Sequence, residues 1–108
     1  MTFIGGINLE LYYHATPYAN LDSILDYGIQ LSRDGLVYMC KSPEDAAKFL
    51  AIRGVKDILA IEVKVLKKLQ NTIVETFDHS ERFFRCRAFA STIPIPTNRF
   101  GKMTRYEL

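Results

Sequence analysis

Residues 11–50, LYYHATPYANLDSILDYGIQLSRDGLVYMCKSPEDAAKFL, decide the fold of this chain. The segment begins in an apolar run, and a strand is expected over residues 9–13 because Leu and Tyr favour extended backbone there. Pro17 disfavours the helical conformation for Thr16, so a turn is expected at that point. A strand that ends just before His14 therefore opens the domain.

A short helix is expected after this turn. Asn20 is a good N-cap residue, and Gly28 suits the position that ends a helix because glycine accepts a left-handed conformation. Between them, Leu21, Ile24 and Leu25 have the i, i+3, i+4 spacing of one apolar helix face. The segment thus predicts a helix of two turns with one buried side.

A second strand and a second helix follow. Residues 36–40 form a short apolar run that predicts a buried strand. Ser42 then provides an N-cap, Pro43 fits the first helical position, and two acidic residues follow at the positive end of the helix dipole. The expected buried stripe of this helix is Ala46, Phe49 and Leu50, with Glu44 and Lys48 spaced for an exposed i, i+4 pair.

The second half of the chain reads mainly as strands. Runs rich in β-branched and aromatic residues lie at residues 58–66, 72–77 and 83–89, and residues 102–108 could form a final edge strand. Both helices thus lie in the first half, and strands dominate the rest, which predicts an α+β fold and not an alternating β-α-β one. A length of 108 residues predicts a single domain over residues 1–108.

Composition excludes several classes of protein. Hydrophobic residues make up 48% and charged residues 24%, which is ordinary for a globular domain. A formal net charge of +2 is too small to indicate a nucleic-acid-binding protein, and we interpret Lys64, Lys67 and Lys68 as a solvated strand end and turn. No run approaches the roughly 20 apolar residues of a membrane helix, and no signal peptide is apparent. We expect a cytoplasmic protein without membrane contact; its oligomeric state stays open.

The cysteines and histidines do not predict a metal site. A zinc site would need ligands spaced in pairs, and Cys40, Cys86, His14 and His79 show no such spacing. In a cytosolic chain the two cysteines are expected to be buried thiols.

The order of these motifs resembles a known family. An HAT segment at residues 14–16, an NL..IL..G helix and a VYM.KSPE.A segment follow one another in this chain. This order is similar to the front half of the ADP-ribosyltransferase superfamily, which includes the NAD-dependent RNA 2′-phosphotransferases. The resemblance covers the first half well and the last third loosely. It implies two small β-sheets around a split that holds NAD as a substrate.

The resemblance also assigns roles to residues. His14 would contact a ribose hydroxyl of NAD, and Ala15, where the family often has glycine, would hold the nicotinamide amide through its backbone. Thr16 would fix the turn through its hydroxyl. Tyr38 would stack its ring on nicotinamide. His14 and Tyr38 are therefore expected to line one pocket.

The last third departs from the family. Many of these transferases have a glutamate on a late strand that stabilises developing positive charge. Here that strand carries Arg85, Cys86 and Arg87 but no acid, and Glu75, Asp78 and Glu81 are alternatives only by their proximity in sequence. Arg85 and Arg87 lie at alternate strand positions and could grip a phosphate or an acceptor together, as in the 2′-phosphotransferases. His79 is better explained as a loop residue than as a catalytic one.

Two hypotheses follow for function. The first is an NAD-dependent transferase that uses His14, Tyr38 and Arg87 in catalysis, with His14, Ala15, Thr16, Tyr38 and Arg85 binding NAD, and that passes ADP-ribose to a protein or nucleic-acid acceptor. The second is a catalytically inactive module of the same fold that binds a protein partner, an interpretation favoured by the absent glutamate. A protein that binds NAD or an ADP-ribose-like ligand without turnover lies between them.

Overall fold

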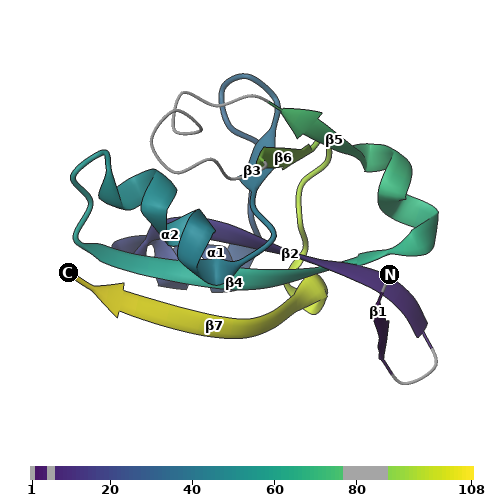
Figure 1. Cartoon of the computed structure of the whole chain (residues 1–108), viewed down its shortest axis with the longest axis horizontal. Helices are drawn as coiled ribbons and strands as arrows, with labels where there is room; N and C mark the ends of the chain where they lie inside the picture. Colours follow the sequence, from purple (N-terminus) through teal and green to yellow (C-terminus); the bar gives the residue numbers. More distant parts are fainter. Residues whose placement is uncertain (1, 5–6, 77–87) are drawn as a thin grey trace.

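The computed structural model describes residues 2–4, 7–76 and 88–108, and within these ranges the chain forms two antiparallel β-sheets and two short α-helices (Figure 1). The larger sheet has the strand order β1-β2-β4-β7, with bounds Thr2–Ile4, Ile7–Pro17, Asp57–Leu66 and Phe100–Glu107. The smaller sheet has the order β3-β6-β5, with bounds Val37–Met39, Ala88–Ser91 and Ile73–Thr76. The helices are α1 (Leu21–Tyr27) and α2 (Pro43–Ala51), and short 3-10 turns η1, η2 and η3 span Tyr18–Asn20, Lys67–Thr72 and Thr97–Arg99. The predicted α+β class is confirmed.

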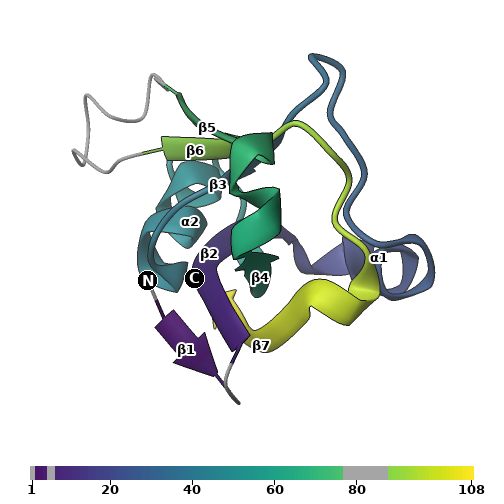
Figure 2. The same cartoon turned by 90° about the vertical axis from the view of Figure 1, so that its right-hand side faces the viewer.

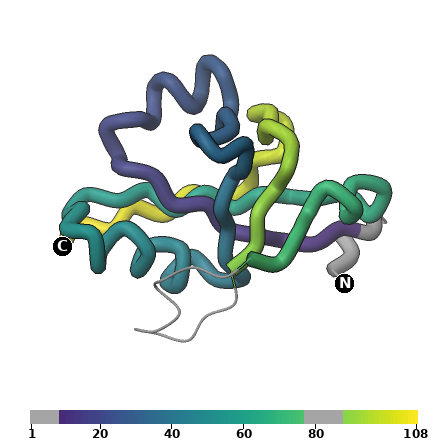
Figure 3. Tube along the Cα trace, turned by 90° about the horizontal axis from the view of Figure 1, so that it is seen from above, coloured from purple at the N-terminus to yellow at the C-terminus, as the bar shows by residue number. Residues whose placement is uncertain are grey.

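The larger sheet is covered on both faces. Alternate residues of a strand point to opposite faces, so Tyr12 and its neighbour Val63 lie on one face while Tyr13 and Ala15 lie on the other. The first face packs against the smaller sheet and α1, and the second packs against α2 (Figure 2). The main core contains these buried side chains: Tyr12, Ile24, Ile29, Val37, Met39, Leu59, Ile61, Val63, Val65, Phe89 and Ile95. The strands β2 and β4 run side by side along the long axis of the molecule (Figure 3).

Strand β2 is longer than the sequence predicts. It continues through His14 and Thr16 to Pro17, so the expected turn at Thr16 is wrong and the chain turns only in η1. The extended conformation that a proline imposes on the preceding residue suits a strand as well as a turn. Pro17 also has no hydrogen atom on its nitrogen, and this nitrogen faces the edge of β2 that β4 does not occupy, so no ladder bond is lost.

Helix α1 forms where expected, but two details differ. Asn20 occupies the N-cap position, yet its side chain does not cap the helix and instead donates a hydrogen bond to Thr16 Oγ1 at 3.0 Å. Leu25 is 50% exposed, so the predicted buried face reduces to Ile24, with Leu21 partly buried beside it. This short helix packs mainly on η1 and η3, which offer it no broad surface to cover.

The start of α2 matches the prediction. Ser42 is the N-cap, its Oγ accepts a hydrogen bond from the Asp45 N–H at 3.1 Å, and Pro43 is the first helical residue. Instead of the expected pair with Glu44, Lys48 forms an ion pair with Asp45 at 3.9 Å, one residue closer in sequence.

The sequence predicts the bounds of the late strands only in part. The strand predicted over residues 83–89 is described only from Ala88, and β6 then runs to Ser91. Arg85, Cys86 and Arg87 lie outside the described residues. Strand β7 is an edge strand as predicted, although it begins two residues earlier, at Phe100. In the ranges that the structure describes, no helix is long and apolar enough to cross a membrane.

Candidate functional site

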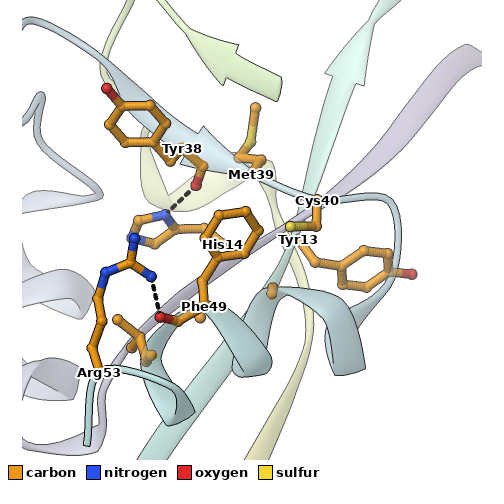
Figure 4. Close-up of a pocket in the computed structure, with 10 residues that line it drawn as sticks. Tyr13, His14, Tyr38, Met39, Cys40, Phe49 and Arg53 are labelled. Atoms are coloured by element: carbon orange, nitrogen blue, oxygen red, sulfur yellow. Dashed lines mark hydrogen bonds between the residues drawn. The ribbon is translucent and has the colours of Figure 1, made fainter. Parts of the chain in front are cut away.

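A pocket of about 340 Å³ lies between one edge of β2, the strand β3 and the helix α2 (Figure 4). It is lined by Tyr13, His14, Ala15, Tyr38, Met39, Cys40, Ala46, Phe49, Leu50 and Arg53. His14 and Tyr38 therefore share one pocket, as the sequence predicts. Binding sites for small molecules are typically concave and mostly apolar with a few polar groups, and this pocket has that character.

The pocket opens where β2 of the larger sheet and β3 of the smaller sheet stop pairing. Tyr13 and Cys40 form a two-way backbone pair, with both N–H to O distances at 2.8 Å. In an antiparallel ladder the next such pair would join Ala15 to Tyr38, two residues further along each strand. No such pair forms, and within the described residues neither the N–H nor the C=O of Ala15 has a hydrogen-bond partner. Both groups face the pocket edge, because Ala15 has the same orientation in the strand as Tyr13.

The His14 side chain occupies the position of the missing backbone bond. Its Nδ1 lies 2.8 Å from the carbonyl oxygen of Tyr38 (Figure 4). A carbonyl only accepts hydrogen bonds, so Nδ1 carries the proton and donates it. In the neutral ring Nε2 is then an acceptor, which gives the imidazole one defined role toward a ligand hydroxyl.

The environment keeps the His14 ring neutral. Burial against the surrounding protein lowers its pKa below the ordinary value of 6.5, and the weaker effect of the Tyr38 carbonyl acts in the opposite direction. The imidazole is therefore uncharged at neutral pH, which preserves Nε2 as an acceptor.

Tyr38 contacts His14 through its backbone and not through its ring. Its side chain is 37% exposed, and its hydroxyl donates a hydrogen bond to Asp34. Figure 4 shows the ring directed away from the imidazole, at the rim of the pocket. Hydrogen bonds from Ser32 and then from Tyr38 hold the pKa of the Asp34 carboxyl below its usual value, so this anchor is ionised at neutral pH. The ring is available at the rim, and its stacking role stays a prediction.

Thr16 does not belong to the pocket. It is buried, and its hydroxyl accepts the hydrogen bond from Asn20 that ties η1 to the end of β2. The turn that this hydroxyl is predicted to fix lies in η1 and not at Thr16 itself. The Thr16 side chain does not line this pocket, and its contact with NAD stays a prediction.

Helix α2 supplies a wall of the pocket that the sequence pattern assigns to the core. Phe49 and Leu50 line the pocket and are only partly buried. Arg53 follows Phe49 by four residues, donates a hydrogen bond to the Phe49 carbonyl, and holds its guanidinium 5.7 Å from the Phe49 ring centre. The signal in the sequence is this i, i+4 spacing of an aromatic residue and an arginine past the last buried turn.

No carboxylate is among the described residues that line the pocket. Of the acidic alternatives, Glu75 is exposed on β5, whereas Asp78 and Glu81 lie outside the described ranges, as do His79, Arg85 and Arg87. Across the described part of the chain, no group of three or more His, Cys, Asp or Glu side chains is placed to hold a metal ion. Cys40 is buried at the pocket floor.

No protein-family model and no curated protein matched this chain.

Proposed function

We propose that this chain binds NAD through its nicotinamide end and acts as an ADP-ribosyltransferase-like protein on a protein or nucleic-acid acceptor. The observation that carries the proposal is the gap in the ladder at Ala15, whose backbone N–H and C=O face the pocket without a partner in the described residues. Unpaired backbone groups at a pocket are uncommon, because leaving them unmet by water or ligand costs free energy.

A primary carboxamide is the natural complement to these two groups. Its C=O can accept from the Ala15 N–H, and its NH2 can donate to the Ala15 C=O, which reproduces the pairing that β3 does not make. Nicotinamide carries such a carboxamide on a flat ring. The apolar wall formed by Met39, Phe49 and Leu50 suits that ring.

The remaining polar groups suit a ribose and a charged linkage. The Nε2 of His14 can accept a hydrogen bond from a ribose hydroxyl, because Nδ1 is committed to Tyr38. Arg53 is the one side chain with a permanent charge among the described lining residues, and its charge suits a phosphate beyond the ribose. A pocket of about 340 Å³ is at the small end of the range for ligand sites, so the adenosine end would lie outside it.

In the proposed reaction the bond between the nicotinamide nitrogen and ribose C1′ breaks. The electron pair of that bond leaves with neutral nicotinamide, and positive charge develops on the ribose. A nucleophile of the acceptor then attacks C1′ and gives up its proton. Ala15 would hold the leaving group, and His14 would hold the sugar; roles for Arg85 and Arg87 stay predictions.

A binding function without turnover is the second candidate. It is favoured by one observation, the absence of a carboxylate from the described pocket lining. Without that charge, the developing cation lacks the electrostatic stabilisation on which many such transferases depend. In this case NAD would bind at the same groups but remain intact.

Two proline variants test the site. Ala15→Pro removes the N–H that faces the pocket, and Leu11→Pro is its matched control. Leu11 lies four residues earlier on the same edge of β2, its N–H also has no partner in the described residues, and it lies outside the pocket. Nicotinamide and NAD should raise the melting temperature of the parent and of Leu11→Pro, and should not raise that of Ala15→Pro.

A turnover assay separates binding from catalysis. Release of nicotinamide from NAD in the presence of parent protein would support the transferase, whereas binding without release would support the second candidate. If neither nicotinamide nor NAD raises the melting temperature of the parent, the proposal fails. If Ala15→Pro does not fold, His14→Ala provides the second test with calorimetry.

A further inference from the structure

Strand β7 lies at the border of the larger sheet and has one open edge. It is the last strand in the order β1-β2-β4-β7, and among the described residues no strand pairs with its far side (Figure 1). The unpaired backbone groups of such an edge are a template for a further strand. The question is therefore which strand fits this edge.

The backbone groups of Met103 and Arg105 face the open edge. The N–H of Leu108 donates to the carbonyl of Lys56 at 2.7 Å, so Tyr106, two positions earlier, also bonds to β4. The odd-numbered residues between these positions have the opposite orientation. In the ranges that the structure describes, the N–H and C=O of Met103 and Arg105 make no hydrogen bond on that side.

The side chains leave most of this edge accessible. The Arg105 guanidinium is held over its own sheet, because it donates to the Asp57 carboxylate at 2.9 and 2.8 Å and lies 3.7 Å from the ring centre of Tyr18. Edge strands are commonly protected by lysine, proline or a bulge. In β7 the lysine, Lys102, and the shift in register against β4 both lie near its start, and residues 103–107 contain no lysine or proline.

The charges on β7 select one way of pairing with a second copy of the strand. In a two-fold antiparallel pair, one residue on the axis faces its own copy. Arg105 or Glu107 on the axis would place like charges opposite each other, and Met103 on the axis would bring Arg105 against the irregular start of the second strand. Thr104 on the axis would give neither charge an opposite partner. With Tyr106 on the axis, Arg105 faces Glu107 of the second copy in both directions.

We propose that two copies of this chain pair through β7, antiparallel and centred on Tyr106. Glu107 already lies 3.3 Å from Arg105 Nε on the same face of the strand, so the two copies would bring together alternating charges. Within the described residues Arg105 Nη1 makes no hydrogen bond, and it can donate to Glu107 of the second copy. Leu108, which is 68% exposed, would then lie against Thr104 of the second copy.

Sedimentation over a concentration series tests this pairing. The parent should change from monomer to dimer as its concentration rises, and added salt should weaken the dimer because exposed charges are screened. Glu107→Lys should weaken dimerisation about tenfold, because two attractive pairs become repulsive. Asp26→Lys is the matched control: Asp26 is exposed on α1, so its variant changes the net charge equally and should dimerise like the parent.

Cysteine variants test the register. Under mild oxidation Tyr106→Cys should crosslink to its own copy faster than the parent does, because two residues on the axis are within reach of a disulfide. Thr104→Cys should not, because it would face Leu108 of the second copy and lie too far from its own copy. Crosslinking at position 104 and not at 106 would contradict the proposed pairing.

The proposal is overturned if the parent stays monomeric at every concentration, an outcome that would leave the edge to a strand from another protein. It is also overturned if Glu107→Lys dimerises as tightly as Asp26→Lys. No residue of β7 lines the first pocket, so nicotinamide should raise the melting temperature of Glu107→Lys as it raises that of the parent. Failure of this pairing would therefore leave the proposed binding of NAD unaffected.

Discussion

His14 and Tyr38 are joined by a hydrogen bond that replaces one backbone pair of a β-ladder. The imidazole Nδ1 donates to the Tyr38 carbonyl at 2.8 Å, at the position where Ala15 would pair if the ladder from Tyr13 and Cys40 continued. One side chain thus satisfies the carbonyl of β3 and leaves the Ala15 backbone open to the pocket. The histidine at this position both shapes the gap and lines it.

The first prediction concerns this hydrogen bond. His14→Ala should lower the affinity for NAD about tenfold, because it removes the acceptor for a ribose hydroxyl and leaves the Tyr38 carbonyl to pair with Ala15. The loss of one hydrogen bond with a partner left buried costs about 1–3 kcal/mol, and about 1.4 kcal/mol corresponds to tenfold. Calorimetric titration with NAD provides the measurement.

Tyr38→Phe serves as the control for His14→Ala. It removes only the hydroxyl that bonds Asp34 and keeps both the ring and the backbone carbonyl that holds His14. Its NAD affinity should stay within about threefold of the parent, which is less than 1 kcal/mol. Equal losses in the two variants would place the effect in the loop around Asp34 and not at the imidazole.

The second prediction follows from the lowered pKa of His14. In the unfolded chain this imidazole takes up a proton near pH 6.5, whereas in the folded chain burial delays protonation to a lower pH. Between those two values the unfolded state binds more protons, so the free energy of unfolding falls as the pH is lowered below about 6.5 and levels off below the folded pKa.

Urea unfolding of the parent and of His14→Asn at a series of pH values between about 7.5 and about 5 tests this. The parent should lose more stability across that interval than the variant, because asparagine does not titrate. The lowered pKa values of Glu10, Asp34 and Asp57 contribute only at more acidic pH, where their carboxyls begin to take up protons. Parallel curves for the two proteins would show that His14 is not desolvated in the folded state.

The predictable parts of the fold rest on local signals. The Ser42 cap, the Gly28 end of α1 and the strand around Tyr38 each follow from residues within one or two turns of each other. The gap at Ala15 is not predictable from the residues themselves, because it depends on where β2 and β3 part, and these strands are separated by a helix and a loop.

Local signals mislead where one residue suits two structures. Pro17 predicts a turn, but it is the last residue of β2. Its nitrogen faces the edge of β2 that β4 does not occupy, so the missing N–H breaks no ladder hydrogen bond. Leu25 fits a helical stripe, yet α1 is too short and too peripheral to bury it. In both cases the tertiary environment decides between alternatives that the local pattern allows.

The third prediction concerns the cap of α2, the helix that walls the pocket. Ser42→Ala should lower the free energy of unfolding by about 1 kcal/mol, because the Asp45 N–H loses its acceptor. The change would appear as a lower urea midpoint with an unchanged slope. Ser42→Asp, which retains a capping oxygen, should recover most of the loss; an alanine variant with the parent midpoint would show that the serine does not cap.

The last prediction concerns Gly28, where α1 ends and the chain joins the Ile29–Ile95 bridge. Gly28 has a φ of 74°, and a Cβ at this position would lie 2.5 Å from the Ile95 carbonyl oxygen. Gly54 has a φ of 90°, but a Cβ there would meet no atom within 4 Å, so Gly54→Ala experiences only the backbone strain. That strain costs about 1–2 kcal/mol, whereas Gly28→Ala adds a collision with backbone that cannot rotate away.

Thermal and urea unfolding should therefore show a larger loss of stability for Gly28→Ala than for Gly54→Ala, accompanied by weakened protection of the Ile29 and Ile95 amides in hydrogen exchange. Equal losses would mean that the segment at Ile95 moves aside readily and that the bridge contributes little to holding α1 against the sheet.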